Sequence, residues 1–135
     1  NTVSTAAEIS NRFGDPFAVC PGVDNLAFEA LAAGAVGWVA GLVVAFPEET
    51  VAIYRLMQAK RYDEALAIHR WFRPLLDLDV SSYLVQNLKL VEALVTGTTE
   101  RVRAPRLPLE GARRAEVERL VAEALARRPM LAKAA

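Results

Sequence analysis

Two stretches of the chain are apolar without alternation, and they constrain the fold more than any other feature. They cover residues 17–20 (FAVC) and 36–44 (VGWVAGLVV). Runs of this kind are typical of strands that are covered on both faces, as in parallel sheets. The intervening residues 25–33 carry apolar side chains at helical spacing, and Gly34 follows where a glycine C-cap is expected. The order strand, helix, strand predicts a βαβ unit with parallel strands.

The rest of the chain has the pattern of helices. One helical stripe precedes the first apolar run, and Pro47 with the acidic pair behind it marks the start of a helix after the second run. Further apolar stripes fall within residues 51–57, 65–75, 84–95 and 117–124. Two parallel strands alone make a marginal sheet with open edges. We therefore expect an α/β fold that is one end of a larger α/β protein.

Composition and charge exclude several classes of function. Sixteen Lys and Arg residues balance sixteen Asp and Glu residues, so no net field directs the chain to nucleic acid or to a membrane surface. The longest apolar run, residues 35–46, is too short to span a bilayer, and NTVST at the start has no signal-peptide pattern. Cys20 is the single cysteine, which rules out an intramolecular disulfide and suits a reducing compartment. We expect a cytoplasmic protein that binds neither nucleic acid nor a membrane.

A series of short motifs then identifies a relationship. GVDN is followed by an apolar segment that ends in AFPEE, and further along the chain come NLKLVEAL and VRAPRLPL. In this order the motifs resemble the C-terminal part of the dihydrodipicolinate synthase and N-acetylneuraminate lyase superfamily. The segments AGLVVAFPEE and VRAPRLPL are most similar to the branch of 1-pyrroline-4-hydroxy-2-carboxylate deaminase.

The resemblance implies the C-terminal portion of a (β/α)8 TIM barrel, with its last two parallel strands and their helices, followed by a C-terminal helical extension. Residues 17–20 would form the seventh strand, and the eighth would begin at Val36. The last part of the barrel would occupy residues 1–60 and the helical extension residues 61–135. Both strands would end at the face of the barrel where active sites of this fold are built.

An enzyme is the function that the resemblance implies. The chain would be part of a class I lyase that forms a Schiff base with a small α-keto or imino acid, in the first place a deaminase or dehydratase. The alternatives are a dihydrodipicolinate synthase or a sugar-acid aldolase or dehydratase of the same superfamily, and, in another class, a non-catalytic half-barrel with a structural or assembly role. No cofactor and no metal are implied. We expect a homo-oligomer or association with the missing N-terminal half-barrel.

Five residues correspond to substrate-binding positions of the family. In the sugar-acid branch, the glycine, the aspartate and the residue after it in the GVDN-type loop bind substrate hydroxyls, which implies Gly22, Asp24 and Asn25. The eighth-strand backbone near the carboxylate of the keto acid corresponds to Val39, with Gly41 just beyond. Glycine at such a place allows backbone to approach a ligand closely.

The resemblance places no catalytic residue in this chain. The family's nucleophilic lysine lies on the sixth strand, and the spacing puts it before Asn1. Lys60, Lys89 and Lys133 fall on or beyond helices at surface-type positions and do not replace it. We therefore expect the chain by itself to be inactive. Many relatives carry asparagine in the eighth strand where this sequence has Val44.

Several residues also have ordinary structural interpretations. The Pro-Gly turn before Asp24 suits the N-cap of the following helix, and the aspartate can serve both roles. Cys20 is interpreted as a small buried hydrophobe, because no histidine lies nearby in sequence to activate it. His69, the single histidine, lies one position off the apolar stripe and is predicted on a helix surface rather than as a metal ligand or base. Trp38 is predicted to pack in the core.

Overall fold

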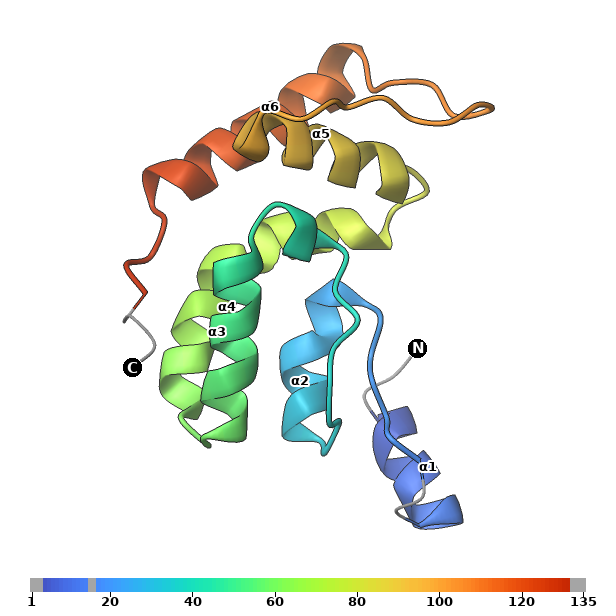
Figure 1. Ribbon diagram of the computed structural model, residues 1–135, viewed down its shortest axis with the longest axis vertical. Coiled ribbons are helices and arrows are strands. Elements are labelled where there is room, and N and C mark those ends of the chain that lie inside the picture. Colours follow the sequence, from blue (N-terminus) through green and yellow to red (C-terminus); the bar gives the residue numbers. More distant parts are fainter. Residues whose placement is uncertain (1–3, 15–16, 132–135) are drawn as a thin grey trace.

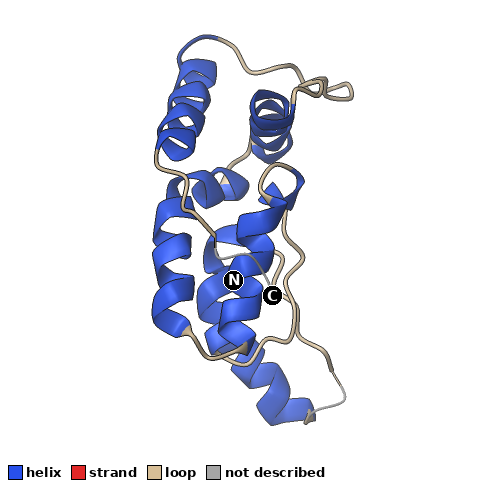
Figure 2. Cartoon of the chain, turned by 60° about the vertical axis from the view of Figure 1, so that its left-hand side comes forward, coloured by secondary structure: helices blue, strands red, loops and turns tan. Residues whose placement is uncertain are grey.

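The computed structural model of the protein describes residues 4–14 and 17–131, which form helices joined by loops. The α-helices of this part of the chain are α1 (Ser4–Phe13), α2 (Ala27–Ala32), α3 (Pro47–Gln58), α4 (Tyr62–Leu76), α5 (Leu84–Thr96) and α6 (Gly111–Ala126). Short 3-10 helices, η1 (Asp24–Leu26), η2 (Leu42–Val44) and η3 (Asp77–Val80), lie between them. Figure 2 shows these elements as helices, with the connecting segments as loops.

The prediction of an α/β fold with the last two strands of a barrel is wrong for the described residues, which contain no β-strand. Residues 17–23 and 35–40 are extended and lie side by side, but in the described structure only two backbone hydrogen bonds join them. The Val36 amide donates to the Val19 carbonyl and the Val39 amide to the Pro21 carbonyl, each at 2.9 Å. Two bonds do not make a sheet ladder, and parallel strands depend on neighbours that cover their edges and faces.

The second apolar run also changes conformation partway along. It is extended to residue 40, turns at Gly41 and ends in η2 instead of continuing as a strand. An unalternated apolar run does not distinguish a strand from a short buried helix. Here Leu42, the first residue of η2, is completely buried, so the run supplies the core through a helical turn.

The helices are arranged in two groups (Figure 1). Helices α2, α3 and α4 pack side by side, while α5 and α6 form a second pair beyond η3; α1 lies apart at the N-terminal end. One hydrophobic cluster joins the two groups, because buried residues of α3 and α4 are continuous with those of α5 and α6. The largest apolar side chains of this core that are fully buried are Leu42, Phe46, Ile53, Phe72, Leu75, Leu76, Leu90, Val91 and Val117.

The helix predictions are confirmed where a start signal and an apolar stripe coincide. Helix α3 begins at Pro47, as predicted, and its first turn carries Glu48 and Glu49. The short helix predicted at residues 25–33 is present as η1 followed by α2, and Gly34 after it has a φ of +101°, the left-handed conformation that glycine adopts freely. In the described residues, no helix is both long enough and apolar enough to cross a membrane.

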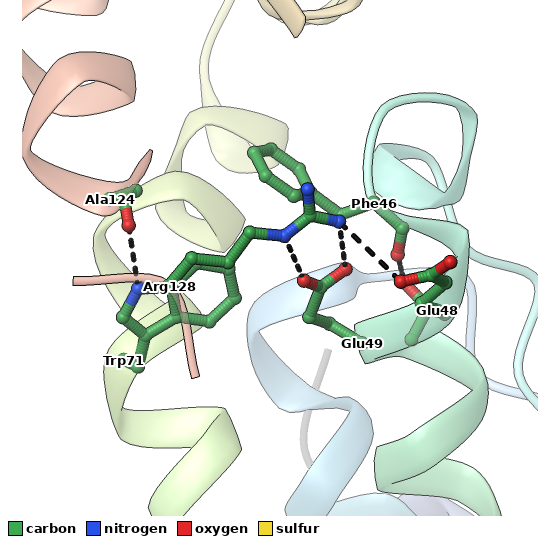
Figure 3. A network of polar contacts seen from close by, with 7 residues as sticks. Phe46, Glu48, Glu49, Trp71, Ala124 and Arg128 are labelled. Atoms are coloured by element: carbon green, nitrogen blue, oxygen red, sulfur yellow. Dashed lines mark hydrogen bonds and ion pairs between the residues drawn. The ribbon is translucent and has the colours of Figure 1, made fainter. Parts of the chain in front are cut away.

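The segment after α6 is fastened to the start of α3 (Figure 3). The Nε of Arg128 lies 2.5 Å from Oε1 of Glu49, and its Nη2 lies 3.2 Å from Oε2 of the same carboxylate. Beside this pair, the indole N–H of Trp71 donates to the carbonyl of Ala124 at 3.0 Å, and the ring of Trp71 meets Phe46 edge to face. These contacts attach the end of α6 to both α3 and α4.

Candidate functional site

The five residues predicted to bind substrate lie together in the structure. The loop of residues 21–25 is next to the segment of residues 39–41, and the backbone bond between Val39 and Pro21 joins the two. A Cβ on Gly22 would lie 4.0 Å from the carbonyl oxygen of Val39. Gly22 and Val39 are exposed, the latter at 68%, whereas Asp24 is completely buried. The structure therefore assembles the predicted residues, and their role in binding remains a prediction.

Asp24 organises this region through its carboxylate. Its Oδ1 accepts hydrogen bonds from the amide of Gly41 at 2.9 Å and from the indole N–H of Trp38 at 3.1 Å. Its Oδ2 accepts from the amide of Leu42 at 2.8 Å. Burial raises the pKa of this carboxyl above its usual value, against the opposing effect of the two backbone donors. Hydrogen bonds to a charged acceptor are among the stronger ones in proteins, so Asp24 holds the turn at Gly41 firmly.

The alternative role predicted for Asp24, the N-cap of the following helix, is wrong. Asp24 is the first residue of η1, whose N-cap position is Val23, and no side chain caps that end. The carboxylate instead receives the amides at the start of η2, a different helical turn, because Gly41 occupies the N-cap position there. The unpaired amides at a helix start need an acceptor, and Asp24 supplies it from a distance of 17 residues in sequence.

Asn25 is held by its side-chain amide. Its Nδ2 donates to Oδ1 of Asp77 at 2.8 Å, and the same oxygen accepts from Nε of Arg73 at 2.9 Å. The Oδ1 of Asn25 is buried and has no hydrogen-bond partner among the described residues. An unpaired buried carbonyl costs about 1–3 kcal/mol. Asn25 thus carries an unused acceptor.

A small cleft of about 230 Å³ opens beside the loop, on the side that faces α1. Gly22, Pro21 and Cys20 form part of its wall, together with Ile9 of α1 and Ala30 of α2. Ligand pockets in proteins typically measure about 300–1,000 Å³, so this cleft suits a molecule of a few heavy atoms. Cys20 is exposed, which corrects the prediction that it is a buried hydrophobe.

His69 was predicted on a helix surface, and the structure shows that this is wrong. The residue is 4% exposed, and its ring stacks on Phe28 of α2 with a centroid distance of 5.2 Å. Neither ring nitrogen has a hydrogen-bond partner in the described part of the chain, and burial lowers the pKa of the imidazole. Trp38, by contrast, packs against the core as predicted.

Sequence reasoning missed the residues that support the loop from a distance. They are Trp38 as the partner of Asp24, and Asp77 and Asp79 in η3. The Asp-x-Asp spacing of residues 77–79 was a visible signal, but nothing in the sequence showed which segment the two carboxylates would meet.

The described lysines have no arrangement typical of an activated amine. Lys60 ends the turn after α3 and is exposed, and Lys89 forms an ion pair with Glu92 at 2.7 Å. Lys133 lies outside the described residues. In the part of the chain that the structure covers, no group of three or more His, Cys, Asp or Glu side chains is placed to hold a metal ion.

The sequence of this chain is similar to proteins of a known family. The model of the dihydrodipicolinate synthetase family matches residues 1–124. The 4-hydroxy-tetrahydrodipicolinate synthase of Acidobacterium capsulatum is 31% identical over 116 residues, which cover 86% of this chain and 38% of that protein. The chain therefore spans about two fifths of the length of this relative.

Solved structures show the same similarity in three dimensions. The 4-hydroxy-tetrahydrodipicolinate synthase of Methylacidiphilum fumariolicum SolV matches with a TM-score of 0.79 and 26% identity, over 94% of this chain and 43% of that one. A variant of the Sulfolobus solfataricus 2-keto-3-deoxygluconate aldolase matches with a TM-score of 0.78 and 20% identity, over 94% of this chain and 43% of that one. The second match indicates a shared fold only.

Proposed function

The chain belongs to the dihydrodipicolinate synthetase family, and on this basis we propose that it forms part of a Schiff-base lyase acting on a small α-keto acid. The observation that supports the proposal most directly is the assembly around Asp24. That carboxylate draws Gly41 and Leu42 against the loop of residues 21–25, beside a cleft of about 230 Å³. Of the five residues that the resemblance implies, Gly22 lines this cleft.

The reaction that we propose is of the synthase type. The two relatives with the higher sequence identity are both 4-hydroxy-tetrahydrodipicolinate synthases, which favours this reaction over a deaminase. Deamination of 1-pyrroline-4-hydroxy-2-carboxylate is the narrower alternative, supported only by the resemblance of AGLVVAFPEE and VRAPRLPL. A sugar-acid aldolase of the same superfamily is the third candidate.

In this mechanism the residues described here bind the substrate and do not attack it. A lysine amine from outside this set would condense with the keto group and release water, and the resulting iminium would draw electrons from the neighbouring bond. Gly22, which lines the cleft, and Val39 would approach the substrate through their backbone, and Asn25, whose amide is anchored to Asp77, would keep the loop in place beside the substrate. Asp24, whose carboxylate is already occupied by intramolecular donors, would act by holding this arrangement.

The proposal is tested with a chimera. The matching C-terminal segment of the Acidobacterium capsulatum synthase is replaced by this chain, and the folded product is reduced with borohydride in the presence of pyruvate. We expect a covalent adduct whose peptide map places it on a lysine outside the 135 residues. A folded chimera that traps no pyruvate supports the non-catalytic interpretation and refutes the proposal.

Substrate turnover separates the candidates. The chimera is offered pyruvate together with an aldehyde acceptor for condensation, 2-keto-3-deoxygluconate for cleavage and 1-pyrroline-4-hydroxy-2-carboxylate for release of ammonia. We expect Asn25→Ala to raise the KM of the accepted substrate, and Asn11→Ala, an exposed asparagine of α1, to leave it unchanged. Equal KM values for the two variants contradict the role of Asn25.

A further inference from the structure

Two carboxylates of η3 accept hydrogen bonds from the loop of residues 21–25. The backbone amide of Asp24 donates a hydrogen bond to Oδ2 of Asp79 at 2.9 Å, and Nδ2 of Asn25 donates one to Oδ1 of Asp77 at 2.8 Å. The two acceptors are two residues apart in the same 3-10 helix, and the two donors are consecutive residues of the loop. Figure 1 shows η3 between α4 and α5, close to the start of α2. The pairing is therefore between one short helix and one short loop.

This pairing also meets the turn at Gly41. A Cβ on Gly41 would lie 3.1 Å from Oδ1 of Asp79 and 3.3 Å from Oδ2 of Asp24. The backbone at Gly41 thus lies close to both carboxylates. Asp24 is held at both ends, by Asp79 at its amide and by Gly41 and Leu42 at its carboxylate. Helix η3 thus contacts this assembly through hydrogen bonds to Asp24 and Asn25.

Asp77 does more than anchor Asn25. A carboxylate only accepts hydrogen bonds, so the amide of Asn25 must present its nitrogen to Asp77 and its oxygen to the other side. That oxygen is the acceptor that has no partner in the described residues. Arg73, whose Nε lies 2.9 Å from Oδ1 of Asp77, forms an ion pair that holds the Asp77 side chain in place. Asp77 thereby fixes the orientation of the Asn25 side-chain amide.

We infer that Asp77 and Asp79 are positioning residues of the substrate site: η3 fixes the loop of residues 21–25 and sets the orientation of the amide of Asn25. The inference rests on the proposed function, since it assigns the loop to substrate.

The first test needs no substrate and uses the chain itself. Amide hydrogen exchange at Asp24 is compared in Asp79→Ala, Asp79→Asn and Asp63→Ala, where Asp63 is an exposed aspartate at the start of α4. Loss of a charge-assisted hydrogen bond is expected to speed exchange at Asp24 by at least about tenfold in Asp79→Ala. Asp79→Asn keeps an acceptor and restores slow exchange, and Asp63→Ala changes nothing there. Unchanged exchange in Asp79→Ala overturns the inference.

The conservative variant gives an independent readout if Asp79→Ala fails to fold. Asp79 is a nearby negative charge that contributes to the raised pKa of Asp24. In Asp79→Asn the carboxyl of Asp24 is therefore expected to titrate at lower pH, as followed by carbon NMR, while the fold is kept. An unmoved titration with retained fold means that the two side chains are not in contact, which also overturns the inference.

The second test uses the chimera and the keto-acid substrate. We expect Asp79→Ala and Asp77→Ala to raise KM about tenfold with kcat within twofold, because both act on binding geometry, and Asp79→Asn to restore KM. A chimera that is active and keeps its KM in both alanine variants refutes the positioning role. A folded wild-type chimera that never traps pyruvate refutes the proposed function instead, and the exchange data still report whether η3 holds the loop.

Discussion

Replacing Arg128 with methionine removes the charge that faces Glu49 and keeps most of the length of the side chain. Glu49 is 1% exposed in its side chain, so its carboxylate has little access to compensating water. Arg128 donates two hydrogen bonds to this carboxylate, and its guanidinium lies over the ring of Phe46 (Figure 3). Its Nη2 also lies 3.9 Å from Oε2 of Glu48. The substitution therefore leaves a buried carboxylate without its cationic partner.

The size of the effect follows from the exposure of the two partners. Breaking a fully buried ion pair costs about 3–5 kcal/mol, whereas an exposed pair contributes about 0–1 kcal/mol. The side chain of Arg128 is 38% exposed, so solvent screens part of the interaction and water can reach the place that it vacates. We expect Arg128→Met to lower the free energy of unfolding by about 2 kcal/mol.

Urea unfolding followed by tryptophan fluorescence measures this loss. Trp71 lies in the same network, through its bond to Ala124 and its contact with Phe46, so its emission reports on the region that is perturbed. With a slope of about 2 kcal/mol per molar urea, the midpoint is expected to fall by about 1 M. A double-mutant cycle with Glu49→Gln isolates the coupling between the two side chains.

Arg127→Met is the matched control, because Arg127 precedes Arg128 and is exposed. We expect its midpoint to stay close to that of the wild type. If Arg128→Met and Arg127→Met unfold at the same urea concentration, the end of α6 is not held by Glu49 and the reasoning fails.

Three further predictions concern the core and the candidate site. Asp24→Asn retains the shape of the side chain but places an NH2 group against backbone amide donors. We expect it to lower the free energy of unfolding by about 2–3 kcal/mol and to shift the fluorescence emission of Trp38. Wild-type values for both measurements would refute the role of the carboxylate. Gly41→Ala is expected to lower the free energy of unfolding by about 1–3 kcal/mol, because its Cβ would lie 3.0 Å from the side chain of Leu88. Gly22→Ala, whose Cβ would lie 4.0 Å from its nearest neighbour, should change stability little. Equal urea midpoints for the two variants would contradict this packing. Because burial lowers the pKa of His69 below its usual 6.5, the unfolded chain takes up the proton first, so stability is complete above about pH 6.5 and falls as the pH drops toward the folded pKa. His69→Phe removes this loss, and unfolding curves between pH 7.5 and 5 that are parallel for wild type and variant argue against it.

The local parts of the fold could be predicted from the sequence. Pro47 at the start of α3, Gly34 after α2 and the stripes of the later helices each depend on residues within a few positions of one another. Interactions of that range are set by chain geometry and by the burial of one helix face. The residues around the loop were identified through a resemblance; the structure places Gly22 near Val39, and their role in binding stays a prediction.

The absence of the two predicted strands could not be foreseen from local sequence pattern, because a β-strand forms only when a neighbouring strand completes its backbone hydrogen bonds. Residues 17–20 have the composition of a covered strand, yet in the described structure the segment of residues 17–23 forms only two backbone hydrogen bonds with residues 35–40. The partners of Asp24 lie at Gly41 and Asp79, 17 and 55 residues away, and no spacing rule connects them. His69 was misjudged for a similar reason, since Phe28 of α2 covers a position that the stripe of α4 leaves outside.

The bond between Glu49 and Arg128 also has a consequence for the order in which the molecule forms. It joins residues 79 apart in sequence, whereas the bonds inside α3 and α6 join residues four apart. Closing so long a segment costs about 2–3 kcal/mol more in chain entropy than closing a helical turn, so this contact is expected to form after the helices have already packed. Contacts made late contribute little to the rate of folding and much to the rate of unfolding. Loss of Arg128 should therefore shorten the lifetime of the folded state while leaving the time needed to reach it nearly the same.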